Sequence, residues 1–270
     1  MQTGTVRKLK TVHRNSDRNR KMVNRAGIIA GAFLALVLLS AGVWQFTKSR
    51  THQVFGGIVT RVETKEKALA LTFDDGPTLH TGRIVELLDS LDVKATFFVT
   101  GRELEEHMQE GRKLALGGHE LGNHSYSHRR MIFKSGSFIK EEIERTNTLI
   151  REAGYQGRIA FRPPYFNKLI TLPHYLKKNG MKTILCNIEP ETQLGFSAPA
   201  EAISTYVAAN ASPGSIILLH IMYDSRKEAL ASLPALVSSL KEQGYRFVTV
   251  SELLALDNGT TFKPDGNEPG

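Results

Sequence analysis

Ionisable side chains recur at the ends of short apolar segments in this 270-residue sequence. Asp74 and Asp75 follow the apolar run that begins at Ala68, and His124 and His128 follow another short segment. Two imidazoles and one carboxylate can hold a metal such as zinc and leave positions free for water and substrate. The pattern therefore indicates a catalytic metal site at Asp75, His124 and His128, although turn-forming aspartates and two surface histidines would give the same letters.

Further ionisable residues end later apolar segments. Arg162 precedes two prolines, Glu189 and Glu191 follow the next segment, and His220 ends the run SIILLH. An arginine can orient a carboxylate through paired hydrogen bonds. Taken singly, Arg162 also fits an ordinary salt bridge, and His220 fits a hydrogen-bonded histidine at the end of a strand.

Short apolar strands alternate with amphipathic helices between these residues. The sequence predicts strands at residues 58–62, 68–73, 95–99, 120–122, 159–161, 182–188, 215–219 and 246–250, and helices at 81–91, 103–116, 137–153, 173–178, 199–210 and 227–242. Such alternation is typical of parallel βα units, whose functional side chains gather at the carboxyl ends of the strands. The spacing fits an open doubly wound sheet and a closed barrel equally well.

Four motifs resemble those of the polysaccharide deacetylases that carry a NodB homology domain, the carbohydrate esterase family 4. They are FDDGP at 73–77, HSYSH at 124–128, RPPY at 162–165 and ILLH at 217–220, and they occur in the family's order between residues 68 and 256. The resemblance implies a deformed (β/α)7-type barrel in the α/β class. It also implies a metal-dependent deacetylase whose ion is zinc, with Co²⁺, Ni²⁺ and Mn²⁺ as alternatives.

The resemblance implies a role for each matching residue. Asp75, His124 and His128 correspond to the metal ligands of the family. Asp74 corresponds to the catalytic base, and His220 corresponds to the catalytic acid.

Three more residues match positions of known role. Arg162 corresponds to the arginine that orients the base. Tyr165 corresponds to the residue whose backbone N–H holds the oxyanion and whose ring lines the acetyl pocket, and Leu218 corresponds to another wall of that pocket.

One stretch departs from the family pattern. The family often has Trp-x-x-Asp-Pro-x-Asp-Trp after the fifth strand, where this chain reads CNIEPETQ from Cys186. The carboxylate that orients the acid histidine must then come from Glu189 or Glu191, or be missing. Phe166 stands where glycine is common, and the segment 220–226, HIMYDSR, has no role that the sequence explains.

The first 46 residues are interpreted as a cytoplasmic tail and a membrane anchor. Residues 1–25 hold eight Lys and Arg against one Asp, and residues 26–46 hold no charged side chain. A helix of that length spans a bilayer, and the positive-inside rule places the N-terminus in the cytoplasm and the remainder outside. A cleaved signal peptide and a buried core helix are the alternatives. Gly27 and Gly31 would allow an anchor-mediated dimer, although a monomer is expected.

The sequence thus predicts a tail (1–25), a transmembrane signal-anchor (26–46), a tether (47–67), a catalytic domain (68–257) and a disordered tail (258–270). The body carries little of the net charge of +8, so no nucleic-acid partner is predicted. The single cysteine excludes an intrachain disulfide. The predicted function is removal of N-acetyl groups from an N-acetylglucosamine-containing cell-surface polysaccharide, peptidoglycan- or chitin-like. The alternatives are an O-acetyl esterase acting on acetylated xylan or a similar glycan, and a non-catalytic glycan-binding protein.

Overall fold

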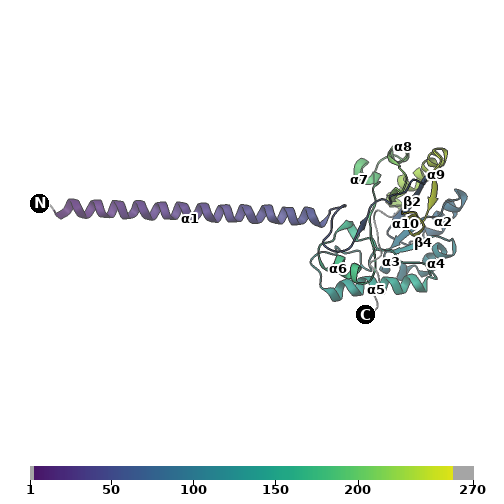
Figure 1. Cartoon of the computed structure of the whole chain (residues 1–270), viewed down its shortest axis with the longest axis horizontal. Helices are drawn as coiled ribbons and strands as arrows, with labels where there is room; N and C mark the ends of the chain where they lie inside the picture. The colour runs from purple at the N-terminus through teal and green to yellow at the C-terminus, as the bar shows by residue number, and fades with distance from the viewer. Residues whose placement is uncertain (1–2, 258–270) are drawn as a thin grey trace. The chain divides into compact units, whose positions relative to one another are not determined.

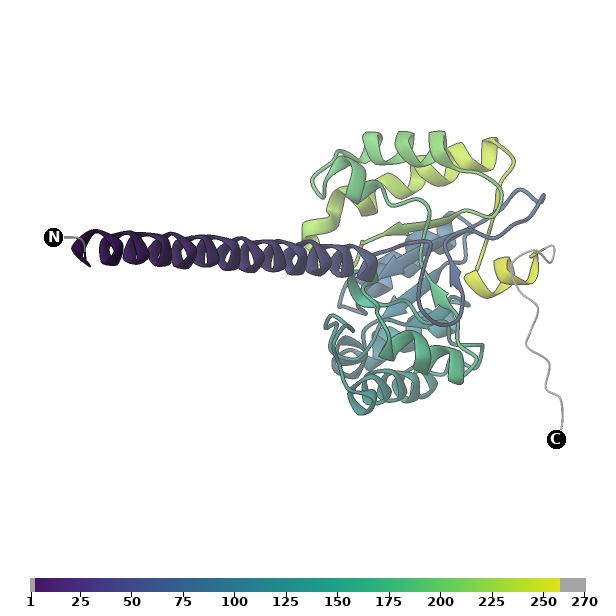
Figure 2. The same ribbon diagram turned by 60° about the vertical axis from the view of Figure 1, so that its left-hand side comes forward.

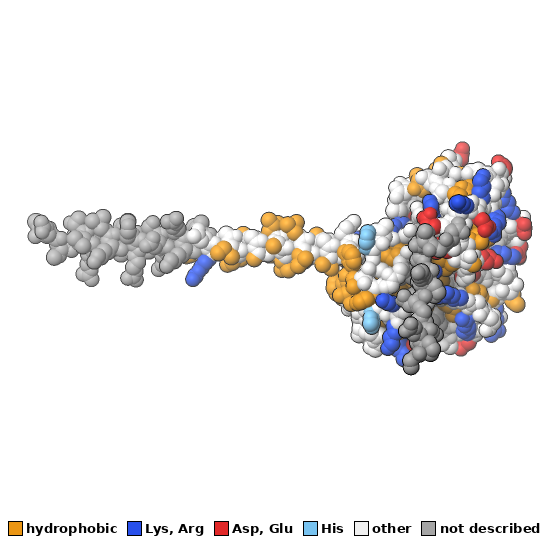
Figure 3. Space-filling model, in the orientation of Figure 1, with side chains coloured by type: hydrophobic (Ala, Val, Ile, Leu, Met, Phe, Trp, Pro, Cys, Tyr) orange, Lys and Arg blue, Asp and Glu red, His pale blue; other side chains and the backbone are white. Residues whose placement is uncertain are grey.

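A computed structural model describes residues 3–257, and the chain divides into two compact units between Phe46 and Thr47. The first unit contains the helix α1 (Thr3–Thr47), whose last residue lies at the boundary. Its segment Gly27–Thr47 has a mean hydropathy of 2.2, and its apolar side chains are not buried by protein. Figure 3 shows these side chains along the described part of the helix. The helix is long and apolar enough to cross a membrane, a property that a signal sequence shares.

A parallel sheet forms the centre of the second unit. Strand β2 (Ala68–Asp74) pairs with β3 (Thr96–Val99) and β6 (Ile216–Leu219), and β3 pairs with β4 (Glu120–Asn123). Strand β7 (Arg246–Val248) pairs with the first residues of β2. Every residue of β2 is buried, which explains why five of its seven residues are apolar, because a parallel strand is covered on both faces.

Single bridges close this sheet into a barrel. Asn123 at the end of β4 pairs with Phe161, and Phe161 pairs with the first residue of β5 (Thr183–Ile184). Ile188, which follows β5, pairs in turn with β6. The ring is irregular on this side, and the predicted strands at 159–161 and 182–188 are reduced to a bridge and two residues. The Arg162 guanidinium donates hydrogen bonds to the Ile184 and Leu185 carbonyls, which a regular strand would use to pair with its neighbour.

Helices cover the outside of the barrel, as Figures 1 and 2 show. Ile84 and Leu88 of the first of them pack into the main core cluster, and the predicted helix 103–116 is broken into two at His107. The helices are α2 (Thr81–Ser90), α3 (Gly101–Glu106), α4 (Met108–Leu116), α5 (Gly136–Glu152), α6 (Thr171–Lys178), α7 (Pro190–Leu194), α8 (Ala200–Asn210), α9 (Lys227–Glu242) and α10 (Val250–Ala255), with 3-10 turns η1 (Pro164–Phe166) and η2 (Asp224–Arg226).

Capping side chains determine where two helices begin. The sequence pattern predicted a different start for one of these helices and did not predict the other. The helix predicted at 137–153 is α5, which begins one residue earlier, at Gly136, because Ser135 caps it by accepting a hydrogen bond from the Phe138 N–H at 3.2 Å. Helix α10 was not predicted. It begins after Thr249, which forms a capping box with Glu252.

The segment that follows α1 belongs to the second unit and packs within it. It contains β1 (Ile58–Val59), which pairs with β5, and the buried Val62, whose N–H donates to the Gly214 carbonyl at 2.9 Å. Gly214 has a φ of 80°, and a Cβ there would lie 1.8 Å from the Val62 oxygen, so only glycine fits. The division into tether and catalytic domain stays a prediction, and the predicted tail 258–270 lies outside the described residues.

Candidate active site

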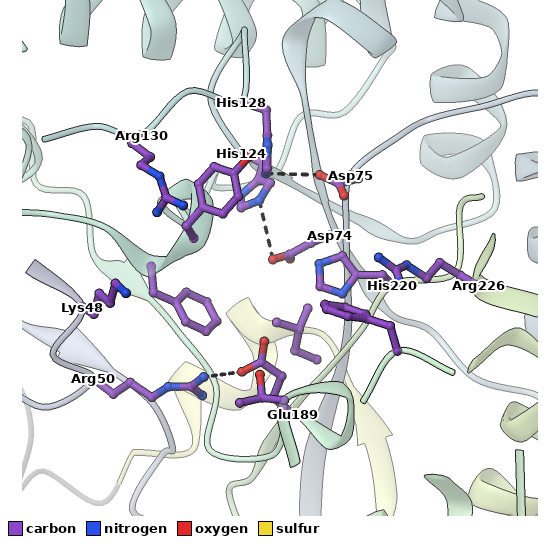
Figure 4. Close-up of a pocket in the computed structure, with 15 residues that line it drawn as sticks. Lys48, Arg50, Asp74, Asp75, His124, His128, Arg130, Glu189, His220 and Arg226 are labelled. Atoms are coloured by element: carbon purple, nitrogen blue, oxygen red, sulfur yellow. Dashed lines mark hydrogen bonds and ion pairs between the residues drawn. The ribbon is translucent and has the colours of Figure 1, made fainter. Parts of the chain in front are cut away.

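A cavity of about 500 Å³ opens at the carboxyl ends of the barrel strands. Figure 4 shows the side chains that surround it. Seven residues singled out from the sequence line this cavity: Asp74, Asp75, His124, His128, Tyr165, Leu218 and His220. The eighth, Arg162, is buried beneath it and hydrogen-bonded to Asp74. The remaining lining residues are Lys48, Arg50, Arg130, Phe166, Glu189, Thr192, Phe196 and Arg226.

The two adjacent aspartates both face the cavity because the strand ends between them. Neighbouring residues of a strand point to opposite faces, but β2 ends at Asp74 and Asp75 has a φ of 74°. Seven non-glycine residues have positive φ within the described chain, and five of them lie in or beside this cavity. These are Asp75, Ser125, His128, Tyr165 and Phe166. Such conformations cost of order 1–3 kcal/mol each and gather at functional sites.

Three side chains could hold a metal ion together. One potential ligand atom from each of Asp75, His124 and His128 lies within 4.8 Å of the other two. The Nδ1 of His124 donates to the Arg162 carbonyl at 2.8 Å, which leaves the lone pair on Nε2 for a metal. The Nε2 of His128 lies 3.4 Å from Asp75 Oδ1. Two imidazoles and one carboxylate fit a divalent metal with open positions, so the three side chains suit the ion that the sequence implied.

Electrostatics in this trio favour a cation. Burial lowers the pKa of His124 to about 3, so its ring is neutral, as a ligand requires. Burial also raises the pKa of Asp75, and the charges of Asp74 and Glu103 act in the same direction against the attraction of His128. A cation at the centre would offset this cost by stabilising the Asp75 carboxylate.

Arg162 holds the Asp74 carboxylate in place. Its Nη1 donates to Asp74 Oδ1 at 2.7 Å and to Thr72 Oγ1 at 2.9 Å, and its Nη2 donates to the Leu185 carbonyl at 3.0 Å. The guanidinium also stacks over the Phe98 ring at 4.0 Å. A fully buried arginine with this many partners fixes the orientation of the carboxylate that it contacts.

The Asp74 carboxylate is ionised and can accept a proton. Burial by itself would raise the pKa of Asp74, but the Arg162 charge, together with His124 and His220, outweighs burial and lowers the pKa below its usual value. Its Oδ2 lies 3.6 Å from His124 Nε2, next to the three potential ligands.

Glu191 is the carboxylate that contacts His220. The His220 Nδ1 donates to Glu191 Oε2 at 2.5 Å, and the His220 backbone N–H donates to Oε1 at 3.1 Å. Helix α7 begins at Pro190 and turns Glu191 inward, where it is 3% exposed, whereas Glu189 pairs with Arg50. Of the two glutamates that the sequence left open, the structure therefore selects Glu191.

The His220 imidazole is held in its protonated form. Burial lowers the pKa of His220, but the Glu191 hydrogen bond and the charges of Asp74, Glu191 and Asp75 outweigh burial and raise the pKa to about 9. With Nδ1 bound to Glu191, the remaining N–H at Nε2 is free to serve as a proton donor.

Aromatic and aliphatic side chains form the walls. The Tyr165 ring lies 4.8 Å from the His128 ring and is 53% exposed, and the Arg130 guanidinium stacks on it at 4.3 Å. Leu218 of β6 is buried at the bottom of the cavity. The oxyanion role of the Tyr165 N–H stays a prediction.

Three residues that contribute to the site were not identified from the sequence. Thr72 lies two residues before Asp74 on β2, so the period of two along a strand was a signal that could have placed it on the same side. Lys48 and Arg50 line the cavity from the predicted tether, and no local pattern connects them with strand ends far along the chain.

Comparison with known proteins identifies the family. The family model described as polysaccharide deacetylase matches residues 61–184. A peptidoglycan-N-acetylglucosamine deacetylase of Bacillus cereus is 33% identical over 202 residues, which cover 74% of this chain and 93% of that protein.

Two crystal structures have the same fold. A peptidoglycan N-acetylglucosamine deacetylase in complex with 4-naphthalen-1-yl-N-oxidanyl-benzamide matches with a TM-score of 0.68 and 27% identity, over 73% of this chain and 92% of that one. A family 4 acetyl xylan esterase from Clostridium thermocellum in complex with a cobalt ion matches with a TM-score of 0.62 and 34% identity, over 70% and 91%. The resemblance and the deformed barrel inferred from the sequence are thereby confirmed. The chain belongs to the polysaccharide deacetylase family, the family 4 carbohydrate esterases of the NodB fold.

Proposed function

We propose that this chain is a metal-dependent hydrolase that removes N-acetyl groups from an N-acetylglucosamine-containing polysaccharide of the cell surface. One observation carries the proposal. The three potential ligands Asp75, His124 and His128 lie in one cavity with an ionised Asp74 and a protonated His220. This arrangement places a base and an acid beside a site for an electrophilic ion.

The chain's own residues would divide the proton transfers between them. A divalent ion held by Asp75, His124 and His128 would supply Lewis-acid chemistry to the acetyl carbonyl and the attacking water. Asp74, oriented by Arg162, would accept a proton from that water. The Tyr165 N–H is proposed to donate to the developing oxyanion, with the Tyr165 ring and Leu218 enclosing the acetyl methyl group.

His220 would complete the reaction by giving the proton at Nε2 to the departing group. An amide nitrogen leaves only when it is protonated, whereas an ester alcohol depends less on this step. The buried Glu191, which keeps His220 charged, therefore favours N-deacetylation over the O-acetyl esterase alternative.

Zinc is the proposed ion, with Co²⁺, Ni²⁺ and Mn²⁺ as alternatives. Zinc accepts a combination of imidazole and carboxylate ligands and commonly has three protein ligands in catalytic sites. The cobalt ion in the related esterase structure is consistent with a site that takes several divalent metals.

The proposed location is the outer face of the cell membrane. Residues 26–46 are proposed as a single-pass signal-anchor, with the basic residues 1–25 in the cytoplasm and the remaining chain, including the proposed tether 47–67 and catalytic domain 68–257, outside. The length and hydropathy of Gly27–Thr47 support this placement. The protein is proposed to act as a monomer on its acetylated polysaccharide, without a nucleic-acid partner.

Acetate release tests the proposed function. The full-length protein in non-ionic detergent is supplied with zinc and incubated with N-acetylglucosamine oligomers, peptidoglycan strands and acetylated xylan, with Asp74→Asn as the control. Release from the N-acetylated substrates that is lost in the control supports the proposal. Release from xylan alone supports the esterase. Bound metal without acetate release from any of these glycans would leave the non-catalytic glycan-binding alternative.

A further inference from the structure

Cationic side chains surround the mouth of the active-site cavity. Lys48, Arg50, Arg130 and Arg226 all line it, and Figure 4 shows them at its edges rather than at its centre. The acidic groups inside are already engaged, because Asp74 contacts Arg162 and Glu189 pairs with Arg50. Four cationic side chains therefore lie where a substrate enters, and Glu189 already offsets the charge of one of them, Arg50.

Arg226 differs from Arg162 and Arg50 in its partners. Arg162 and Arg50 each contact a carboxylate, whereas no carboxylate lies within ion-pair distance of Arg226 in the described part of the chain. Its Nε is buried and has no hydrogen-bond acceptor among residues 3–257. Because Nε is closed to solvent while Arg226 lines the cavity, the terminal Nη groups are the N–H donors that a ligand would meet.

The position of Arg226 is fixed by an aromatic ring. Its guanidinium stacks on the Phe196 ring at 3.9 Å, and it ends the turn η2 immediately before helix α9. Stacking covers one face of the planar guanidinium and leaves the N–H groups pointing along its edge. An arginine held in this way is preorganised to bind a carboxylate through two parallel hydrogen bonds.

Phe196 also places Arg226 close to the reacting centre. The same ring lies 6.3 Å from the His220 ring in an edge-on arrangement, so Arg226 lies one aromatic ring away from the proposed proton donor. The segment 220–226, whose role the sequence did not explain, thus joins the acid histidine to a cation at the rim.

We propose that Arg226 binds a carboxylate of the substrate and that the enzyme prefers an acidic glycan, in which a carboxylate lies beside the N-acetyl group, over a neutral chitin-like chain. This inference rests on the proposed deacetylase function. His220 donates to the sugar nitrogen, and Arg226 reaches a substituent on the neighbouring ring carbon or on the adjoining sugar. The lactyl group of muramic acid in peptidoglycan has this chemistry, because it is ether-linked to the ring carbon next to the acetamido carbon and ends in a carboxylate.

A matched pair of oligosaccharides tests the inference. One is a tetrasaccharide of alternating N-acetylglucosamine and N-acetylmuramic acid with free lactyl carboxylates, and the other is the same tetrasaccharide with each carboxylate converted to a neutral methylamide. The measured quantity is the ratio of kcat/KM for acetate release from the two substrates by the zinc-supplied full-length protein. We expect a ratio of about 10 or more in favour of the carboxylate form, equivalent to ~1.4 kcal/mol.

Variants of Arg226 assign the preference to this residue. Arg226→Gln should bring the ratio close to 1, and Arg226→Lys should keep part of the preference because it retains the charge but loses the planar edge. Arg112→Gln, at an exposed position on α4, should keep the wild-type ratio. The ratio is internal to each variant, so a general loss of activity does not alter its meaning.

Three results of this assay would contradict different parts of the proposal. Equal kcat/KM on the two tetrasaccharides in the wild-type protein overturns the acidic-glycan preference while leaving the deacetylase function standing. A preference that persists undiminished in Arg226→Gln overturns the assignment to Arg226. Absence of acetate release from both tetrasaccharides and from N-acetylglucosamine oligomers overturns the proposed function, and this inference with it.

Discussion

Replacing Glu191 by Gln changes one charge and almost no volume at the residue that contacts His220. Glu191 accepts two hydrogen bonds from His220, one from Nδ1 and one from the backbone N–H. A glutamine offers one acceptor oxygen and one NH₂ group, so it can accept only one of these two bonds. The other donor then faces an amide that is also a donor, inside a buried site.

The size of the effect follows from the contact that is lost. A hydrogen bond to a charged group contributes about 1.5–3 kcal/mol, and one pKa unit corresponds to about 1.36 kcal/mol, so the pKa of His220 should fall by about one to two units. From a wild-type pKa of about 9, the value in Glu191→Gln becomes about 7–8. His220 acts as an acid only while protonated. At pH 9 the wild-type protein therefore keeps about half of its active form, and the variant keeps about 1–10%.

The assay is kcat for acetate release between pH 6 and pH 10, measured on an N-acetylglucosamine oligomer with the zinc-supplied full-length protein. The alkaline limb of the profile should move to lower pH by the same one to two units. Glu189→Gln is the matched control, because Glu189 contacts Arg50 rather than His220, and its alkaline limb should stay near that of the wild type. A Glu191→Gln profile that overlies the wild-type profile, in a variant with an unchanged melting temperature, would refute the proposed link between Glu191 and the charge of His220.

Three further predictions concern the base, the ligands and the buried arginine. Asp74→Asn should lower kcat by at least ~100-fold with metal still bound, and metal analysis beside acetate release checks both statements. Asp75→Ala should lose bound zinc as well as activity, so an unchanged zinc content after dialysis would contradict its ligand role. Arg162→Met leaves the Asp74 carboxylate buried without its cation and should destabilise the protein by about 3–5 kcal/mol in urea unfolding. If Arg162→Met unfolds at the same urea concentration as the wild-type protein, the ion pair between Arg162 and Asp74 contributes little to stability.

The sequence was sufficient to predict that side chains at the ends of the strands lie close together. Asp74 closes β2, His124 follows β4 and His220 follows β6. All three strands are buried, and β2 and β6 are largely apolar. Parallel strands carry their carboxyl ends to the same rim, so an ionisable residue directly after each strand must approach the others. The assignment of chemical roles depended on the family resemblance, because the strand pattern alone leaves both the barrel and the identity of the acid open.

The sequence could not decide between Glu189 and Glu191, because the two residues differ only in how the chain turns. Pro190 begins α7 between them, so Glu191 enters the site while Glu189 turns toward Arg50. Hydrophobic periodicity does not resolve a difference of two residues at the start of a five-residue helix. The same limit explains why the start of α5 was predicted at residue 137 instead of 136.

The predicted tether shows why long-range contacts are the hardest part to foresee. Arg50 pairs with Glu189 and stacks on the Phe166 ring at 4.7 Å, and the Lys168 N–H donates to the Thr47 carbonyl at 3.0 Å. Burial lowers the pKa of Lys168 to about 8, and its ammonium group donates to the carbonyl of Ser49. These contacts make the segment just after α1 one wall of the active-site cavity. A soluble form of the enzyme should therefore begin before this segment, since one that began at the first strand of the barrel would remove part of the wall and leave Glu189 without its cation.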